Sequence, residues 1–241
     1  LNPQQKASSP VAGLSCPNMV AIASGKGGVG KTMIAASVCH ALAAQGKKVL
    51  LFDGDIGLAN VDIQLGLTPD NDLAHVLSGE RSMQDAVTTY KDGNFDILAG
   101  RSGSGSLATL AFTKVTEMRA NLIKLASSYD HVVVDLGAGI DKAVRHMAGP
   151  AAKIYVVITD EPTSLTDGYA FIKLARAANP NADIRVIVNM ASNHLDGNKS
   201  YETLYQACER FLGFKPSLAG IVRRDLKVRE SIRAQSPILI R

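Results

Sequence analysis

Short apolar runs recur along the chain and are separated by segments with a helix-like mixture of apolar and polar residues. The predicted strands are apolar at nearly every position, as in strands buried on both faces of a sheet; they are 19–24, 48–52, 95–98, 131–135, 153–158, 184–188 and 218–222. The predicted helices are 32–45, 72–78, 113–128, 164–178, 199–212 and 226–234. This alternation predicts an α/β fold with a mostly parallel, twisted sheet of about seven or eight strands and helices on both faces.

The composition is that of an ordinary soluble protein and bounds the number of domains. Of the 241 residues 46% are hydrophobic and 20% charged, so one α/β domain can account for the length. We expect a single domain over 18–241 after a flexible leader at 1–17, which is rich in Pro, Ser, Gln and Ala. The low-complexity stretch 102–106 predicts a mobile surface loop. A net charge of +4 is too mild to indicate nucleic acid by itself.

The cysteines and the hydrophobic runs predict a cytoplasmic protein. No Cys-x-x-Cys pair occurs, and we expect reduced thiols at Cys16 in the leader, Cys39 in the first helix and Cys208. The histidines lack metal-ligand spacing, no apolar run approaches the roughly 20 residues that span a bilayer, and no signal peptide is visible. Because residue 1 is Leu and the sequence stops inside an apolar stretch, we expect a trimmed chain.

A glycine-rich loop follows the first predicted strand. Residues 25–32 read Gly-Lys-Gly-Gly-Val-Gly-Lys-Thr, which fits the phosphate-binding pattern Gly-x₄-Gly-Lys-Ser/Thr. The order of strand, loop and helix argues against a chance glycine-rich turn. In such a loop backbone N–H groups point at phosphate oxygens, Lys31 would contact the β and γ phosphates, and Thr32 would offer its hydroxyl to Mg²⁺. The predicted nucleotide contacts are Gly25, Lys26, Gly27, Gly28, Val29, Gly30, Lys31, Thr32 and Met33.

Two further predicted strands end in carboxylates. One leads into Asp53-Gly54-Asp55, and another ends in Asp135 after three valines. Carboxylates at the tips of buried strands are costly unless they meet a cation or ordered water. Beside a phosphate loop, Mg²⁺ with a water nucleophile is the economical explanation, and a helix cap or turn is the alternative for 53–55. The sequence thus predicts a Mg²⁺ site formed by Thr32, Asp53 and Asp135.

Lys26 stands near the start of the loop, where an ordinary phosphate loop needs no lysine. The pattern Lys-Gly-Gly-Val-Gly-Lys-Thr resembles the deviant Walker A loop of the MinD/ParA ATPases. The resemblance implies a P-loop NTPase fold of the SIMIBI type and a homodimer that sandwiches two ATP molecules, with Lys26 reaching the partner's nucleotide. It also implies that Asp55 positions the attacking water and that Asp53 and Asp135 hold Mg²⁺ through water. The implied catalytic residues are Lys26, Lys31 and Asp55, and a solvated surface charge is the alternative for Lys26.

Two later segments are expected to hold the adenine. A predicted strand leads to Asn189-Met190, and in the family an Asn at this point reads the base, whereas an isolated Asn after a strand is more often a turn residue. The family also has Gly-x-Ile-Pro-x-Asp after the last strand, where this chain reads Gly-Ile-Val-Arg-Arg-Asp at 220–225. Arg223 replaces the proline. Because an arginine can also stack on a base, Arg223 and Asp225 are kept as predicted contacts.

Three more stretches, 53–67, 159–174 and 188–190, resemble the flagellar-number regulators of the FlhG/FleN branch of this family. The resemblance covers about residues 19–237 and implies a spatial or numerical regulator of flagella whose ATP-bound dimer meets a membrane and a partner. The partner would be an SRP-type GTPase, a transcriptional activator or a basal-body protein. Membrane binding would use a C-terminal amphipathic helix beyond residue 241, so we expect a cytoplasmic protein with ATP-dependent peripheral membrane or polar association.

Other functions share parts of this pattern. A ParA-type partitioning ATPase would have the same nucleotide residues and would bind DNA; the candidate residues are Arg223, Arg224, Lys227, Arg229 and Arg233. Two acidic residues balance this charge as on a solvated helix face, so DNA is not the favoured partner. MinD-type positioning of the division site is another alternative. A nitrogenase-reductase relative would need paired cysteines, and the complete catalytic set disfavours a scaffold with a dead ATPase.

Overall fold

The molecule is built around one β-sheet. The computed structural model describes residues 15–55, 60–100 and 107–240, and its sheet has the strand order β3-β4-β2-β5-β1-β6-β7-β8. The neighbouring strands are parallel, except that β3 runs antiparallel to β4. The strands are β1 Cys16–Ala23, β2 Val49–Gly54, β3 Thr88–Tyr90, β4 Phe95–Leu98, β5 His131–Leu136, β6 Ala151–Ile158, β7 Ile184–Ala191 and β8 Ser217–Arg223.

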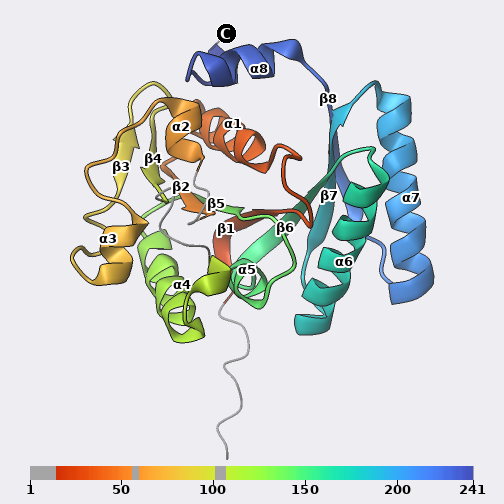
Figure 1. The fold of residues 1–241 in the computed structure, drawn as a ribbon, viewed down its shortest axis with the longest axis horizontal. Helices are drawn as coiled ribbons and strands as arrows, with labels where there is room; N and C mark the ends of the chain where they lie inside the picture. The colour runs from red at the N-terminus through yellow and green to blue at the C-terminus, as the bar shows by residue number, and fades with distance from the viewer. Residues whose placement is uncertain (1–14, 56–59, 101–106, 241) are drawn as a thin grey trace, which may run out of the picture.

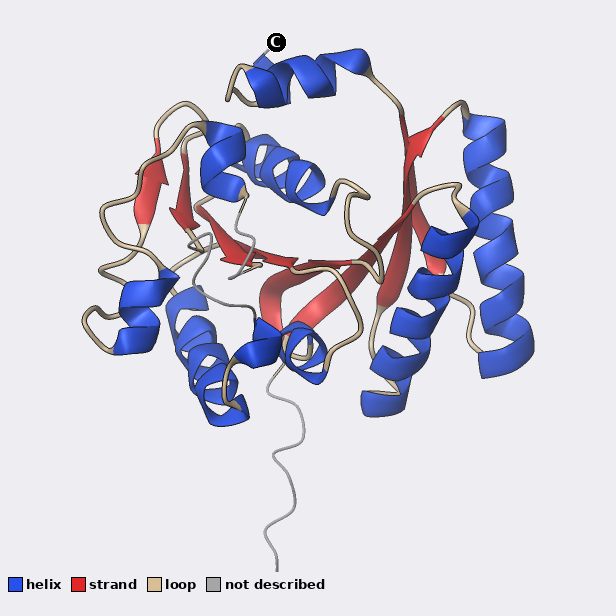
Figure 2. Ribbon diagram, in the orientation of Figure 1, coloured by secondary structure: helices blue, strands red, loops and turns tan. Residues whose placement is uncertain are grey.

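Helices cover both faces of the sheet (Figures 1 and 2). Helices α1 and α2 pack on one face with α8 laid across them, and α4, α5, α6 and α7 pack on the other. Because successive strand side chains point to opposite faces, Ala21 and Ala23 join one hydrophobic core and Ile22 the other. The helices are α1 Lys31–Ala43, α2 Val61–Leu65, α3 Leu73–Ser78, α4 Phe112–Ala126, α5 Lys142–Ala148, α6 Pro162–Ala178, α7 His194–Leu212 and α8 Leu226–Arg233, with short 3₁₀ turns η1 Leu107–Thr109 and η2 Ile238–Ile240.

The predicted fold class is confirmed, and each predicted strand and helix has its counterpart. The predicted strand 95–98 agrees at both ends with β4. The expectation that the strands are buried on both faces is wrong for the edge strand β8, in which no residue is buried. The largest boundary error is in α7, which begins at His194, five residues before the predicted start at 199. The Asn193 side chain accepts a hydrogen bond from the backbone N–H of Asp196 at 2.9 Å and so caps the extra turn.

The pattern missed strand β3, helices α2 and α5, and the short 3₁₀ turns η1 and η2. Strand β3 has three residues, and helices α2 and α5 have five and seven, which is too few for a clear periodicity. The flexible leader was expected to reach residue 17, but β1 already begins at Cys16. Cys16 is buried, and its N–H donates to the carbonyl of Pro150 at 2.7 Å. Residues 1–14 and the predicted loop at 102–106 lie outside the described residues. In the part of the chain that is described, no helix combines the length and apolarity needed to cross a bilayer.

Candidate nucleotide-binding site

The glycine-rich loop connects β1 to α1 at the carboxyl end of the sheet. Gly28 and Gly30 have φ angles of +76° and +89°, a left-handed conformation that favours glycine. A Cβ atom on Gly25 would overlap the backbone carbonyl of Asp167 in α6, and one on Gly30 would overlap the Asn189 amide. A Cβ on Gly27 would lie 3.9 Å from Ala138, in the loop after β5. Gly25 and Gly30 therefore let the loop lie close to α6 and β7, whereas the contact of Gly27 with the β5 loop leaves room for a side chain.

Lys31 is the first residue of α1, and its ammonium group is buried beside the loop. Its Nζ donates a hydrogen bond to Ser24 Oγ at 2.9 Å, and Ser24 Oγ donates to the carbonyl of Lys26 at 2.6 Å. Burial lowers the pKa of Lys31, while the charges of Asp135 and Asp55 oppose that shift. Ser24 has no role in the phosphate-loop pattern, and nothing in the sequence marks it as the partner of the lysine. An anionic ligand at this point would satisfy the buried ammonium group.

Asp53 and Asp135 are neighbours on β2 and β5, and both side chains are 1% exposed. Burial, followed by the charge of Asp135, raises the pKa of Asp53 to about 8. Burial also raises the pKa of Asp135 to about 6, although a hydrogen bond from Thr32 and the charge of Lys31 lower it. Among the described residues nothing donates to Asp135 Oδ1. An orphaned carboxylate oxygen between a second acid and a hydroxyl fits a divalent cation.

These three predicted metal residues form an incomplete shell by themselves. No cluster of three or more His, Cys, Asp or Glu side chains in the described part could hold a metal. Mg²⁺ in nucleotide sites commonly takes one or two carboxylates and completes its shell with water and substrate phosphates. The set formed by Thr32, Asp53 and Asp135 agrees with that kind of site, in which the cation arrives with its ligand.

Asp55 follows β2 and faces the loop after β5. A Cβ atom on Gly137 would lie 3.3 Å from Asp55 Oδ1, so the carboxylate sits against this glycine. Gly139, with φ of +119°, donates its N–H to the carbonyl of Ser24 at 3.0 Å. The loop at 137–140 is thereby tied to the glycine-rich loop, and Asp55 stands where the two meet.

Lys26 contacts its own chain. Its Nζ forms an ion pair with the Glu161 carboxylate and donates to Thr163 Oγ1 at 2.7 Å, at the start of α6. The hydrogen bond from Lys26 and its charge lower the pKa of Glu161. Glu161 and Thr163 lie in a stretch that the sequence marked only by resemblance, without a role for either. The reach of Lys26 into a second subunit stays a prediction.

A pocket at the ends of β7 and β8 gathers the residues expected at the adenine. Five of its lining residues were predicted from the sequence: Met33, Asn189, Met190, Arg223 and Asp225. We call this the base pocket; its other lining residues are Val222, Arg224, Leu226, Val228 and Arg229. Met33 sits one residue after Thr32, so the base pocket adjoins the phosphate loop.

Two of the predicted base contacts already have structural roles. Asn189 is buried, and its Nδ2 donates to the carbonyl of Val29 at 2.8 Å, which fastens β7 to the phosphate loop. Asp225 Oδ1 accepts from the N–H of Lys227 at 2.9 Å and caps α8. Met190 holds a φ of +57°, which is uncommon for a residue with a side chain. Contacts of these residues with a base stay predictions.

Comparisons with known proteins agree with this geometry. The family described as the CobQ/CobB/MinD/ParA nucleotide binding domain matches residues 20–238. The chain is 35% identical to the antiactivator FleN of Pseudomonas aeruginosa, over 91% of this chain and 78% of that protein. It is 30% identical to the flagellum site-determining protein YlxH of Helicobacter pylori, over 90% of this chain and 76% of that protein.

Solved structures give the same answer for the fold. The MinC:MinD cell division protein complex of Aquifex aeolicus aligns with a TM-score of 0.77 and 28% identity, covering 92% of this chain and 88% of that one. MinD of Pyrococcus horikoshii, complexed with Mg-ADP, aligns with a TM-score of 0.74 at 23% identity, covering 93% and 88%, and supports the fold alone. The family and the fold indicated by the phosphate-loop pattern are therefore confirmed.

Proposed function

The chain belongs to the CobQ/CobB/MinD/ParA nucleotide-binding family, and on this basis we propose that it is a Mg²⁺-dependent ATPase. In this proposal ATP joins two copies of the chain, and hydrolysis to ADP and phosphate resets the dimer. The observation that carries the proposal is the burial of Lys31, Asp53 and Asp135 together beside the glycine-rich loop. Such a costly arrangement is explained by a phosphate ligand and a cation.

Each residue at the phosphate end has a task in this reaction. Backbone N–H groups of the loop and the Lys31 ammonium group bind the phosphates. Thr32, Asp53 and Asp135 would hold Mg²⁺, which when bound neutralises charge on the phosphate oxygens. Asp55 orients the attacking water and accepts its proton. As the water oxygen bonds to the γ-phosphorus, the bond from phosphorus to the β–γ bridging oxygen breaks, which releases ADP and phosphate.

Exposed apolar side chains support a dimer at the same edge of the sheet. Among the described residues, Ile140, Leu195 and Leu226 are 42%, 66% and 70% exposed. They follow β5, β7 and β8 respectively, so all three lie on the carboxyl edge beside the phosphate loop. Burial of this edge against a second copy would remove apolar area from water. In the dimer Lys26 would exchange Glu161 for the partner's nucleotide.

The cellular task we propose is regulation of the number or placement of flagella. The similarity to FleN and to YlxH favours this branch. The partner would be an SRP-type GTPase, a transcriptional activator or a basal-body protein, and the protein would shift from the cytoplasm to a membrane or pole with ATP. Positioning of the division site is the second candidate, favoured by the similarity to MinD of Bacillus subtilis, 31% over 91% of this chain.

Phosphate release from ATP tests the enzymatic part of the proposal. We expect turnover by the unaltered protein with Mg²⁺ and none with EDTA. Asp55→Ala should lose about 100-fold or more in rate, in the range typical of a lost general base. Asp70→Ala, at an exposed aspartate away from the loop, is the matched control and should leave the rate unchanged. Equal rates for Asp55→Ala and the unaltered protein would refute the assigned chemistry.

A further inference from the structure

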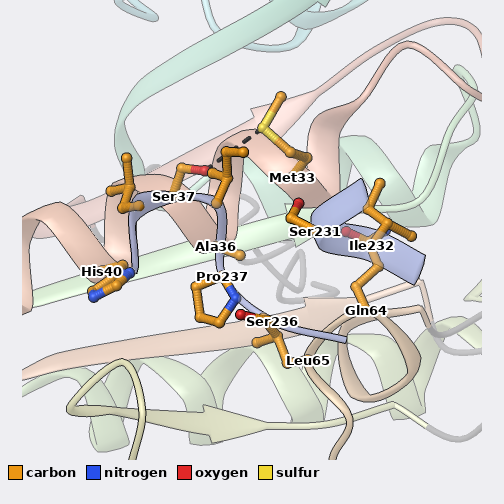
Figure 3. Close-up of a pocket in the computed structure, with 12 residues that line it drawn as sticks. Met33, Ala36, Ser37, His40, Gln64, Leu65, Ser231, Ile232, Ser236 and Pro237 are labelled. Atoms are coloured by element: carbon orange, nitrogen blue, oxygen red, sulfur yellow. Dashed lines mark hydrogen bonds between the residues drawn. The ribbon is translucent and has the colours of Figure 1, made fainter. Parts of the chain in front are cut away.

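The last segment of the described chain crosses one face of the molecule as a strap. It consists of residues 226–239, which form α8 and most of η2, and we call it the C-terminal strap. Figure 1 shows α8 leaving the end of β8 and passing over α1 and α2. Side chains from α1, α2 and the strap line one pocket between them (Figure 3); they include Met33, Ala36, Gln64, Leu65, Ile232 and Pro237.

The strap begins in the base pocket. Leu226, Val228 and Arg229 of α8 line that pocket together with Met190. Met33 lines both the base pocket and the pocket under the strap, so the two spaces adjoin at this residue. A ligand that fills the base pocket would therefore pack directly against the first turn of the strap.

The other end of the strap is fastened to α2. Gln235 Nε2 donates a hydrogen bond to the carbonyl of Ile63 at 3.0 Å. A Cβ atom on Gly66, where φ is +66°, would lie 3.1 Å from the Cβ of Gln235, so the two backbones come close at the end of α2. Gln235 itself has a φ of +49°, which is uncommon for a residue with a side chain. The contact between Gln235 and α2 therefore has a defined geometry, and Gln235 adopts an unfavourable backbone conformation to make it.

Helix α2 in turn holds one of the predicted metal residues. Its first residue, Val61, is buried and donates its N–H to Asp53 Oδ2 at 3.3 Å. Among the described residues Asp53 also accepts the N–H of Asp55, at 3.1 Å. The position of α2 therefore sets one of the hydrogen bonds that orient the Asp53 carboxylate.

We propose that the C-terminal strap couples occupation of the base pocket to the orientation of Asp53; this inference rests on the proposed function. Helix α8 has eight residues and spans about 12 Å as a rigid rod. A base seated against Val228 and Arg229 fixes one end of the rod, and Gln235 transmits that constraint to α2. Because coupling between two sites is reciprocal, the base strengthens Mg²⁺ binding and Mg²⁺ strengthens binding of the base.

Calorimetry with two ligands that differ only in the nucleoside can measure this coupling. ADP and inorganic pyrophosphate are each titrated with Mg²⁺ and with EDTA, which gives a Mg²⁺-dependent gain in affinity for each ligand. For the unaltered protein we expect the gain for ADP to exceed the gain for pyrophosphate by about fivefold or more. Gln235→Ala should lower the gain for ADP to that for pyrophosphate and leave pyrophosphate binding within about twofold. Water can replace the lost bond because Ile63 and Gln235 are exposed, so the fold is retained.

A matched variant serves as the control, and the contrary results separate failure of the coupling from failure of the proposed function. Gln45→Ala makes the same substitution in the exposed turn after α1 and should behave like the unaltered protein. An unchanged gain for ADP in Gln235→Ala, or equal gains for both ligands in the unaltered protein, overturns the coupling and leaves the proposed function standing. Failure of the unaltered protein to bind either ligand with Mg²⁺ overturns both.

Hydrogen exchange gives a second readout on the unaltered protein. Mg²⁺ and ADP should slow exchange of the Val61 amide and of amides in 228–235 by about fivefold more than Mg²⁺ and pyrophosphate do. Equal protection of α2 by the two ligands would contradict the strap's role.

Discussion

At the phosphate end of the site a lysine and two aspartates are buried, whereas at the base end two apolar side chains face solvent. Lys31 is 8% exposed and Asp53 and Asp135 are each 1% exposed, while Val222 is 38% and Leu226 70% exposed. Buried polar groups must find partners, so the phosphate end is fixed by hydrogen bonds to Ser24, Val61 and Thr32 before any ligand arrives. Among the described residues that line the base pocket only Asn189 is buried, and its amide already bonds the carbonyl of Val29. The rest of the base end is under no such constraint, and there the chain has Arg223 where the family has proline.

The difference indicates which end tolerates change. A buried charge that loses its partner destabilises the protein or its complex, while an exposed contact can be replaced by water. We therefore expect substitutions at the phosphate end to abolish binding or to loosen the fold. Substitutions at the base end should change affinity only slightly.

The largest expected effect is that of Lys31→Ala. Removal of the buried ammonium group takes away the charged hydrogen bond to the phosphates, which should weaken ATP binding by about 100-fold or more. Calorimetry at constant Mg²⁺ measures this. Lys47→Ala, at an exposed lysine ahead of β2, is the control. If the ATP affinity of Lys31→Ala is within threefold of that of the unaltered protein, the phosphate end is not the more sensitive of the two.

Stability and ADP affinity measured as a function of pH should distinguish the phosphate end from the base end. The raised pKa values, about 8 for Asp53 and about 6 for Asp135 against 3.8 in the unfolded chain, mean that the unfolded chain releases these protons first. Stability of the metal-free protein should therefore decline as pH rises from about 4 to about 8. Mg²⁺ binds ionised carboxylates, so its effect on ADP affinity should grow roughly tenfold from pH 6 to pH 8.

Two variants provide the controls for that series. Asp53→Asn should lose most of the rise with pH in the effect of Mg²⁺ on ADP affinity. The rise that remains in this variant measures the contribution of the ligand's own protons. Arg223→Lys, at the base end, should retain the full rise. A gain that stays constant with pH in the unaltered protein would show that these carboxylates are not the metal ligands.

Asn189→Ala should have an intermediate effect, on stability. It leaves the buried carbonyl of Val29 without its donor at 2.8 Å, which should cost about 1–3 kcal/mol in free energy of unfolding. Urea denaturation measures this, with Asn181→Ala in the exposed turn before β7 as control. If the two variants unfold at the same urea concentration, the fastening of the phosphate loop to β7 contributes nothing measurable.

Arg223→Pro should have the smallest effect. It restores the family's residue at an exposed position, so ATP affinity should change by less than about threefold, with pyrophosphate affinity unchanged. Titration with ATP and GTP shows whether base selectivity changes as well. A tenfold loss of ATP affinity without a loss for pyrophosphate would make Arg223 a principal base contact and would sharpen the comparison at the base end.

The sequence predicted the phosphate end more completely than its surroundings. Glycine spacing and carboxylates at strand ends are local patterns, so they located Lys31, Asp53 and Asp135 together. Other contacts around the site join residues that are far apart in the chain: Glu161 pairs with Lys26, and Gln235 contacts α2 across 172 positions. Such contacts depend on the packing of whole helices, which no local pattern records. The helices α2 and α5 escaped prediction because their few residues carry little periodicity.

The mass of the particle in solution tests the central claim most directly. With ATP and Mg²⁺, light scattering should find twice the single-chain mass for Asp55→Ala, because the dimer forms and cannot reset. Lys26→Ala should keep the single-chain mass under the same conditions, because it lacks the group that reaches the partner's nucleotide. The same mass for both variants would contradict the ATP-dependent dimer.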